Sequence, residues 1–367
     1  MRKILVITNI LSNGGIETNI LNLLKQFKEH FNFSIATKQY HENTHLYQYL
    51  IRNKINLLRC SFPSTSSISR FKLLYSAFVW PVLSGFKRFD EILSYETRFS
   101  IVVPLYKFLL LKKDGKFIWC PVGHPGMVRK IALEHFRFWK YVDMIVVESE
   151  VHKNKLKDLF SEHKLLVIYS FCFQEFKKIP KCRSYTKCSE IHMAYFGRYS
   201  ENKGLLELLQ IFKEISFSEP NIKLSFFGNH GDYREKLKTM IEAWNLTEKV
   251  SLNDGWNNED EYQEILDCVD FVVLPSKSEG LPLVLLECMA YGKPFVATDV
   301  GAISLLAVDN PDVIVVNNRY DDIKSGILKM IDKIRNNEID SNRLRNYYNK
   351  KFGKDLIISK WKALLDS

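Results

Sequence analysis

The sequence predicts an α/β protein of two domains, each built on a parallel β-sheet. Short apolar runs of β-type residues alternate with helical patterns along the whole chain, as in parallel α/β sheets. The length of 367 residues favours two domains, and 46% hydrophobic residues are enough for two cores. Between the halves, Gln174–Glu190 is polar and weakly periodic. We therefore predict domains at residues 1–173 and 191–350, a linker at 174–190, and a C-terminal segment at 351–367.

The first half is predicted to alternate strands with helices, judged from apolar runs and from helical periodicity. The strands are expected at Lys3–Thr8, Phe33–Thr37, Asn56–Arg59, Glu91–Tyr95, Lys116–Trp119, Met144–Glu148 and Leu165–Tyr169. The helices are expected at Ile16–His30, Ser69–Gly85, Phe99–Leu111, Gly126–Tyr141 and Glu150–Phe160.

The second half repeats the alternation without repeating the residues. Its strands are expected at His192–Phe196, Lys223–Phe227, Val250–Asn253, Phe271–Leu274, Phe295–Ala297 and Val313–Val316. Its helices are expected at Gly204–Ser216, Tyr233–Trp244, Asn258–Asp267, Pro282–Tyr291 and Asp321–Asn336. The tail, Gly353–Leu365, has the pattern of an amphipathic helix.

Cysteine usage and hydropathy indicate the compartment. The chain has seven cysteines, an odd number, without a C-x-x-C pair of the kind that binds metals. Several stand inside apolar runs, as buried free thiols do, which favours a reducing compartment. The apolar run at the N-terminus is too short for a signal peptide, and no run reaches the roughly 18 to 20 residues of a membrane span. We expect a cytoplasmic protein.

The charge is divided unevenly between the halves. Residues 1–180 hold 27 Lys and Arg against 14 Asp and Glu, whereas residues 181–367 hold 25 against 28. A basic half predicts contact with an anionic partner, for which nucleic acid and a membrane surface are the candidates. The charges form no recognisable nucleic-acid module, so we do not expect a nucleic-acid partner.

The basic and aromatic stretch Arg70–Phe89 has two interpretations. Its apolar middle, which contains Pro81, is too short to span a bilayer, but its aromatic residues and flanking cations are typical of an interfacial segment. The run Phe99–Lys113 ends in two lysines and adds to that interpretation. Both runs are also compatible with ordinary core helices. The excess positive charge favours peripheral contact with the inner face of the cell membrane.

The most informative segment is Pro275–Gly301. It follows the apolar run Phe271–Leu274, and Pro282 stands at a plausible first helical position. The helix that follows is apolar nearly all round, which predicts burial, and Glu287 interrupts it. A buried carboxylate is costly unless a partner satisfies it, so we predict a function for Glu287. A second carboxylate, Glu279, stands in the loop before the helix.

Two other loops also follow predicted strands and open helices. The first contains Arg198 and Lys203, two cations of which one supplies a planar fork of donors and the other a point charge. The second contains Gly14 and Gly15, which let a backbone approach a ligand closely. That glycine pair lacks G-x-G-x-x-G, so it does not predict a dinucleotide site, and the chain has no P-loop. A plain tight turn remains the alternative at Gly14 and Gly15.

Together these motifs resemble those of retaining GT-B glycosyltransferases of glycosyltransferase family 4. The resemblance rests on E-G-L-P-L from Glu279, on Glu287 after an E-x7-E spacing, and on A-Y-G-K-P-F-V-A-T-D-V-G ending at Gly301. The segment Gly197–Gly204 resembles the G-R-x-x-x-x-K-G motif of the same family. The resemblance implies two Rossmann-like domains facing a central cleft, with the last helix crossing back to the first domain.

The resemblance also implies roles for the site residues. In the second domain, Glu287 would bind the ribose of a nucleotide-sugar donor, and Arg198 and Lys203 its pyrophosphate. Glu279 and the backbone of Gly280 and Leu281 would hold the donor sugar.

From the first domain, the resemblance implies that His124 approaches the donor sugar and that Gly14 and Gly15 lie over the donor phosphates. A loop histidine that only makes a turn contact is the alternative for His124. Trp256 stands where relatives form part of the nucleobase pocket, and simple packing is the alternative for it.

The implied reaction moves a sugar from a nucleotide-diphospho-sugar, with a UDP-sugar favoured, to an acceptor hydroxyl with retained anomeric configuration. The acceptor would be a saccharide or a lipid-linked saccharide of bacterial surface polysaccharide biosynthesis. No cofactor and no metal are expected, because the two cations would neutralise the leaving diphosphate. Two alternatives stay open: a nucleotide-sugar epimerase on the same fold, and a non-catalytic glycosyltransferase-like subunit.

Overall fold

The computed structural model describes most of the chain in two compact units. The described residues are 1–11, 14–42, 44–59, 88–95, 103–170, 189–228, 233–256 and 258–367, together with 172, 176, 186 and 231. Unit 1 comprises Met1–Phe171 and Asp355–Ser367, and unit 2 comprises Cys172–Lys354. The predicted linker lies largely outside the described residues. So do the helix predicted at Ser69–Gly85 and nearly all of the basic and aromatic stretch Arg70–Phe89.

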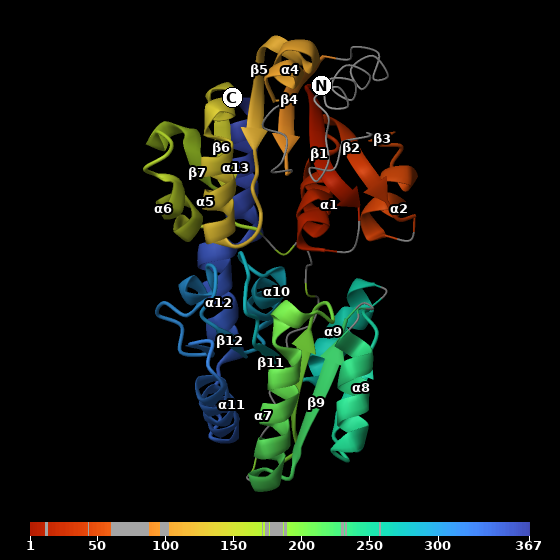
Figure 1. Cartoon of the computed structure of the whole chain (residues 1–367), viewed down its shortest axis with the longest axis vertical. Helices are drawn as coiled ribbons and strands as arrows, with labels where there is room; N and C mark the ends of the chain where they lie inside the picture. The colour runs from red at the N-terminus through yellow and green to blue at the C-terminus, as the bar shows by residue number, and fades with distance from the viewer. Residues whose placement is uncertain are drawn as a thin grey trace. The chain divides into compact units, whose positions relative to one another are not determined.

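Unit 1 is built on a parallel sheet whose strand order is β3-β2-β1-β4-β5-β6-β7 (Figure 1). The strands are β1 Lys3–Leu11, β2 Asn32–Tyr40, β3 Asn56–Arg59, β4 Phe89–Ser94, β5 Leu111–Trp119, β6 Met144–Val147 and β7 Leu165–Val167. The order reverses between β1 and β4, where Ile4 pairs with Glu91 and Ile7 with Ser94. In open α/β sheets, ligands bind at the carboxyl ends of strands beside such a reversal.

The helices of unit 1 begin and end close to the predicted positions, with two differences. They are α1 Gly15–Phe27, α2 His45–Arg52, α4 Val103–Leu110, α5 Pro125–Glu134 and α6 Glu150–Leu156, with 3-10 turns at Phe136–Tyr141 and Glu162–Lys164. Helix α2 was not predicted, although Thr44 caps it and accepts a hydrogen bond from the Tyr47 N–H. The helix predicted at Gly126–Tyr141 was too long, because α5 ends before a 3-10 turn.

Unit 2 is built on a parallel sheet whose strand order is β10-β9-β8-β11-β12-β13. The strands are β8 Ile191–Phe196, β9 Ile222–Phe227, β10 Val250–Asn253, β11 Phe271–Leu274, β12 Phe295–Thr298 and β13 Val313–Val316. The helices are α7 Leu205–Ser218, α8 Tyr233–Ala243, α9 Glu259–Cys268, α10 Leu283–Tyr291, α11 Tyr320–Arg335 and α12 Ser341–Phe352, with 3-10 turns at Glu201–Lys203 and Ile303–Leu306. This order reverses between β8 and β11. The prediction of α/β architecture with two parallel sheets is therefore confirmed.

Helix α12 was not predicted, since its sequence is mostly polar. Its core face consists of Leu344, Tyr348 and Phe352, four residues apart, and the Asp340 side chain caps its first turn. The last helix, α13 Lys354–Asp366, is drawn in blue in Figure 1 and packs within unit 1. There the Lys360 ammonium donates to the Val167 carbonyl at 3.4 Å.

The interior of unit 1 is an apolar cluster in which Trp119 stacks on Trp139 with ring centroids 4.3 Å apart. Among the described cysteines, Cys120, Cys172 and Cys288 are buried free thiols and Cys268 is exposed. Burial raises the pKa of the Cys120 and Cys288 thiols, which keeps them protonated and unreactive. Among the described helices, none is both long and apolar enough to cross a membrane.

Candidate functional site

In unit 2, the predicted loops meet at the carboxyl ends of the central strands. The loop after β8 contacts the loop after β11, since the Lys277 N–H donates to the Asn202 carbonyl at 2.8 Å. The turn after β12 contacts the same loop, since the Ala302 N–H donates to the Gly280 carbonyl at 2.9 Å. These backbone contacts hold residues of the two motifs in one place.

Gly301 is the point at which the turn after β12 lies closest to the Glu279 loop. Its φ of +67° is in the left-handed region, which favours glycine. A Cβ there would stand 2.2 Å from the Glu279 carbonyl and 2.5 Å from the Gly280 carbonyl. The glycine at the end of the A-Y-G-K-P motif therefore determines where the Glu279 backbone lies.

Lys203 and Glu279 form an ion pair at the centre of this arrangement. The Lys203 Nζ lies 2.5 Å from Glu279 Oε1, and the two side chains are only 13% and 12% exposed. A pair so shielded interacts more strongly than a surface pair. The ammonium has three donors, and two of them can still serve an anion beside Glu279. The pair links the two motifs that the sequence analysis identified separately.

Arg198 lies in the same loop as Lys203 but is exposed. Its carbonyl accepts a hydrogen bond from the buried Tyr195 hydroxyl at 2.9 Å, which fixes the backbone and leaves the guanidinium in solvent. Such a side chain is available to an anionic ligand as a planar, permanently charged donor.

Glu287 is less buried than predicted. Helix α10 has a partly exposed face made of Leu283, Val284, Glu287 and Ala290, so the expectation of burial all round was wrong. Periodicity could not reveal this face, because it is apolar apart from the one carboxylate. Glu287 Oε2 accepts a hydrogen bond from the Tyr262 hydroxyl at 3.0 Å. The carboxylate is therefore fixed by a buried partner and also reachable from outside.

Tyr262 is a site residue that the sequence analysis missed. It is 1% exposed, and burial together with the Glu287 charge raises the pKa of its hydroxyl well above the ordinary value, so it remains a donor. Trp256 stacks on its ring with centroids 4.2 Å apart and also packs edge-on against Phe196. In the sequence, Tyr262 is a tyrosine on α9, the helix before β11. Such a residue cannot be distinguished from a core residue by sequence alone.

Ser276 was also missed. It directly follows β11 and Pro275, it is fully buried, and its hydroxyl has no hydrogen-bond partner within the part of the chain that the structure describes. Its carbonyl accepts a hydrogen bond from the Thr298 hydroxyl at 2.5 Å. Nothing in its local sequence distinguishes it from an ordinary loop serine.

In unit 1, the predicted residues lie at the starts of two helices. His124 is the N-cap of α5, where its Nδ1 accepts a hydrogen bond from the Gly126 N–H at 3.1 Å. Gly14 is the N-cap of α1 in an extended conformation, and no atom of the described residues lies within 4 Å of where a Gly15 Cβ would stand. Within the described part of the chain, the first residue of α1 is therefore uncrowded.

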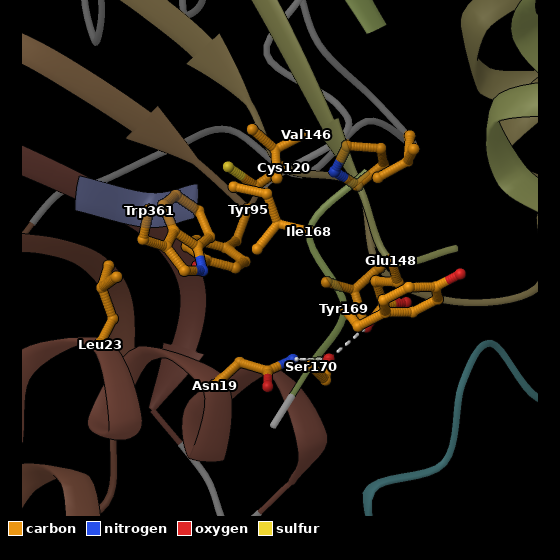
Figure 2. A pocket seen from close by; sticks show the side chains of 13 residues that line it. Asn19, Leu23, Tyr95, Cys120, Val146, Glu148, Ile168, Tyr169, Ser170 and Trp361 are labelled. Carbon is orange, nitrogen blue, oxygen red and sulfur yellow. Dashed lines mark hydrogen bonds between the residues drawn. The ribbon is translucent and has the colours of Figure 1, made fainter. Parts of the chain in front are cut away.

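A small cavity lies at the carboxyl ends of the unit 1 strands (Figure 2). Its volume is about 30 Å³, enough for one or two water molecules. Tyr95, Cys120 and Trp361 are among the residues that line it, together with the polar side chains of Asn19, Glu148 and Ser170. Asn19 Nδ2 donates to Ser170 Oγ at 2.9 Å, and Ser170 Oγ donates to Glu148 Oε1 at 3.3 Å.

The predicted site residues thus fall into two sets. Unit 2 contains Arg198, Lys203, Glu279, Gly280, Leu281 and Glu287, among which Lys203 and Glu279 are in contact, and unit 1 contains His124, Gly14 and Gly15. Among the described residues, no three His, Cys, Asp or Glu side chains are arranged to hold a metal ion.

Comparison with known proteins identifies relatives in sequence and in fold. Residues 186–351 match the family model described as glycosyl transferases group 1. An uncharacterised glycosyltransferase of Methanocaldococcus jannaschii is 27% identical over 213 residues, which are 54% of this chain and 52% of the relative. The lipopolysaccharide 1,2-N-acetylglucosaminetransferase of Salmonella typhimurium is 30% identical over 154 residues, 39% of this chain and 40% of the relative. The chain therefore spans about half the length, or less, of these curated relatives.

Among solved structures, HepE of Anabaena in complex with UDP and glucose superposes with a TM-score of 0.77 at 14% identity, covering 100% of both chains. A sucrose-phosphate synthase of Thermosynechococcus elongatus gives 0.75 at 14% identity, covering 100% of this chain and 98% of the other. These similarities show the fold. The chain thus has the fold of the GT-B glycosyltransferases, and its residues 186–351 match the group 1 glycosyl transferases in sequence.

Proposed function

We propose that this protein is a retaining glycosyltransferase of family 4 that transfers a sugar from a nucleotide-diphospho-sugar to an acceptor hydroxyl. The observation that carries the proposal is the shielded Lys203–Glu279 pair. It joins two motifs that stand 76 residues apart in sequence, at the strand ends where α/β sheets bind ligands. The match of residues 186–351 to a glycosyltransferase family supports the same function.

In the proposed complex, the nucleotide sugar binds to unit 2. Glu287, held by Tyr262, receives the ribose hydroxyls, and Arg198 and Lys203 neutralise the diphosphate as the glycosidic bond breaks. Glu279 accepts hydrogen bonds from the sugar. A UDP-sugar is favoured, since HepE, which shares the fold, was crystallised with UDP, with UDP and glucose, and with UDP-glucose.

A panel of nucleotide sugars tests the donor assignment. The melting temperature of the protein should rise with one nucleotide series, because a ligand at 100 times its dissociation constant adds about 2.7 kcal/mol to stability. Arg198→Ala combined with Lys203→Ala should abolish the shift. Failure of every UDP-, GDP-, ADP- and dTDP-sugar to shift the transition would contradict the proposal.

The anomeric outcome and the metal requirement are tested on the reaction itself. NMR of the product should show the same anomeric configuration as in the donor. Activity should persist in excess chelator, because fixed cations serve the leaving diphosphate. An inverted configuration would overturn the retaining mechanism. A loss of activity that Mg²⁺ or Mn²⁺ restores would overturn the independence from metal. Interconversion of nucleotide sugars without an acceptor would favour an epimerase, and binding without turnover a non-catalytic subunit.

We further propose that the acceptor is a lipid-linked saccharide at the inner face of the cell membrane. Relatives that act on such acceptors include a GDP-mannose:cellobiosyl-diphosphopolyprenol alpha-mannosyltransferase of Xanthomonas campestris, which is 29% identical over 126 residues. The positive excess in residues 1–180 suits an anionic surface, where each cation contributes roughly 1 kcal/mol. Binding to anionic vesicles that salt weakens is the expected result. Absence of binding at low salt would favour a soluble acceptor.

A further inference from the structure

Two buried side chains, which belong to none of the predicted motifs, form hydrogen bonds with the loop that contains His124. Glu148 directly follows β6 and His152 lies in the first turn of α6, and their exposed fractions are 7% and 0%. The Gly123 N–H donates to Glu148 Oε2 at 3.3 Å, and His152 Nε2 lies 2.7 Å from the Gly123 carbonyl oxygen. Both backbone polar groups of Gly123, the residue that precedes His124, therefore contact these two side chains.

The hydrogen bonds determine the tautomer of His152. A carbonyl oxygen only accepts, so Nε2 carries the proton that it donates to Gly123. Nδ1 lies 2.7 Å from Ser149 Oγ and accepts from it. Burial lowers the pKa of His152, which favours the neutral ring that this pattern requires. The residue therefore acts as a rigid donor.

Gly123 accommodates this arrangement through its backbone. Its φ of +120° lies in a region that side chains rarely adopt, and a Cβ there would stand 3.0 Å from Met127 Cε. The His124 ring is in turn fixed by the Gly126 N–H on Nδ1, so its remaining donor is Nε2. The orientation of Nε2 thus depends on the backbone that Glu148 and His152 hold.

The contacts of Glu148 and His152 with Gly123, here called the clamp, extend to the first helix of the chain. Glu148 Oε1 accepts from Ser170 Oγ, which accepts from Asn19 Nδ2 on α1, the helix that begins at Gly15 (Figure 2). Hydrogen bonds therefore connect α1, the segment after β7, and the residue after β6 to the His124 loop. Glu148 and Ser170 are buried in this network, whereas Asn19 is half-buried. Buried hydrogen bonds hold side chains rigidly, as a reacting group requires.

We propose that Glu148 and His152 are positioning residues that fix the His124 loop and thereby set the direction of the His124 Nε2 donor. A part for that donor in sugar transfer rests on the proposed function, whereas the hold of Glu148 and His152 on Gly123 does not. Neither residue needs to touch the substrate.

Matched substitutions test the clamp. Gln at position 152 can still donate to the Gly123 carbonyl, and Gln at position 148 can still accept from the Gly123 N–H. Leu at either position keeps the bulk and removes the hydrogen bonds. The set is His152→Gln, His152→Leu, Glu148→Gln and Glu148→Leu, with the exposed His163→Leu as control.

The first measurement is independent of activity. Ring 15N spectra of the histidine-labelled full chain report tautomers, and a His124→Asn variant assigns the His124 signals. Wild type should contain His152 as the Nε2–H tautomer. The His124 signals should shift in both Leu variants and return near their wild-type positions in both Gln variants. Unchanged His124 signals in a folded His152→Leu protein would overturn the proposal.

The second measurement is kinetic. Each Leu variant should lose at least tenfold in kcat, with the donor KM within about twofold, and each Gln variant should recover to within about threefold. A Glu148→Gln protein that loses as much as Glu148→Leu while its His124 signals are normal would overturn the positioning role of Glu148. If the wild type transfers no sugar, the proposed function fails but the spectra still decide the clamp. Should a Leu variant not fold, Ser149→Ala must shift the His124 signals, and no shift would count against the proposal.

Discussion

At the scale of single residues, unit 2 assigns different surroundings to its two candidate acids. Glu279 is shielded and paired with a cation, whereas Glu287 is partly exposed and held by a phenol. A carboxylate beside a fixed ammonium is suited to the place where charge changes during reaction. A partly exposed carboxylate that is oriented by a neutral donor is suited to accept hydrogen bonds from hydroxyl groups of a ligand.

This difference predicts different kinetics for the two acids. Glu287→Ala should raise the donor KM steeply or abolish donor binding, because it removes contacts made in the ground state. Glu279→Ala should mainly lower kcat, by about 10- to 100-fold if one hydrogen bond to a charged group is lost in the transition state. Steady-state kinetics with varied donor measures both. Near-normal constants in both folded variants would refute the assignment.

The hydroxyl of Tyr262 should affect the binding of the nucleotide-sugar donor and not the rate of sugar transfer. Tyr262→Phe leaves Glu287 in place without its buried donor, so the donor KM should rise about tenfold, equivalent to 1.4 kcal/mol, with little change in kcat. Isothermal titration with the nucleotide gives the same comparison. Tyr291→Phe is the matched control, since that buried hydroxyl pairs with Asp267 instead. Equal effects of the two substitutions would indicate packing rather than positioning.

Glu91 is a buried acid remote from the site, and it predicts how stability depends on pH. It is 0% exposed, and burial raises its pKa to about 7 although Arg2 Nη2 lies 3.0 Å from Oε1. The neighbouring charges on Lys116, Asp90 and Asp366 contribute less than burial does. A raised carboxyl pKa means that the folded state binds the proton more tightly than the unfolded state. Its contribution is therefore present below about pH 4.5 and is lost as pH rises through about 7.

Glu91→Gln should remove the loss of stability that accompanies ionisation of Glu91 as pH rises. Between pH 5 and pH 8, wild type should lose on the order of 1 to 3 kcal/mol of unfolding free energy more than the variant does. Urea denaturation at the two pH values measures the difference, and the exposed Glu29→Gln is the control. A pH dependence that is identical in Glu91→Gln and wild type would show that Arg2 keeps the carboxylate charged.

At the scale of elements, the site depends on loops that lie against one another at the ends of β8, β11 and β12. The Glu279 loop donates a backbone hydrogen bond to the loop after β8 and accepts one from Ala302, next to the close approach of Gly301. The side chains of Lys203 and Glu279 can pair only because these loops are held together. Substitutions in the backbone contacts should therefore act on ligand binding without touching a ligand.

Gly301→Ala tests this dependence. The new Cβ would overlap two carbonyl oxygens, and the left-handed conformation adds about 1 to 3 kcal/mol of strain. We expect a lower melting temperature and a donor affinity reduced by at least tenfold. Gly15→Ala is the control for stability, since no described atom lies within 4 Å of where its Cβ would stand. Unchanged donor binding by Gly301→Ala would show that the loop adapts.

At the scale of the whole molecule, the chain forms two units, of which unit 2 is one continuous segment and unit 1 is made of two segments. Unit 1 is completed by residues 355–367, which return after the whole of unit 2. Helix α13 buries Ile357, Trp361, Leu364 and Leu365, so the core of unit 1 depends on the last residues of the chain. A substitution in that helix should affect unit 1 while unit 2 keeps its own sheet and site.

Trp361→Ala should therefore destabilise unit 1 selectively. The loss of a buried Trp costs about 3 to 5 kcal/mol, and the side chain is 7% exposed. Calorimetry should show one component of the unfolding transition moving to lower temperature, while nucleotide affinity at 15 °C remains unchanged. Lys362→Ala, on the exposed face of the same helix, should leave both unchanged. An equal loss of nucleotide affinity would contradict independent units.

The sequence by itself determined the α/β class, the two parallel sheets and the loops that carry the candidate site, because buried parallel strands are apolar runs and these loops directly follow them. It missed α2, which is short, and α12, which is mostly polar. These helices are stabilised by the burial of Leu50 in α2 and of Tyr348 in α12. It also overestimated the burial of Glu287, because periodicity cannot tell an apolar surface from an apolar core.

Only the tertiary structure decided which polar side chains are partners. The Lys203–Glu279 pair, the Tyr262 hydroxyl on Glu287 and the buried hold of Glu148 and His152 on Gly123 join residues 25 to 76 positions apart. Local sequence records a residue's own conformational preference and burial pattern. Hydrogen bonds and ion pairs depend on distances of about 3 Å between side chains, and those distances exist only once the sheets and loops are assembled.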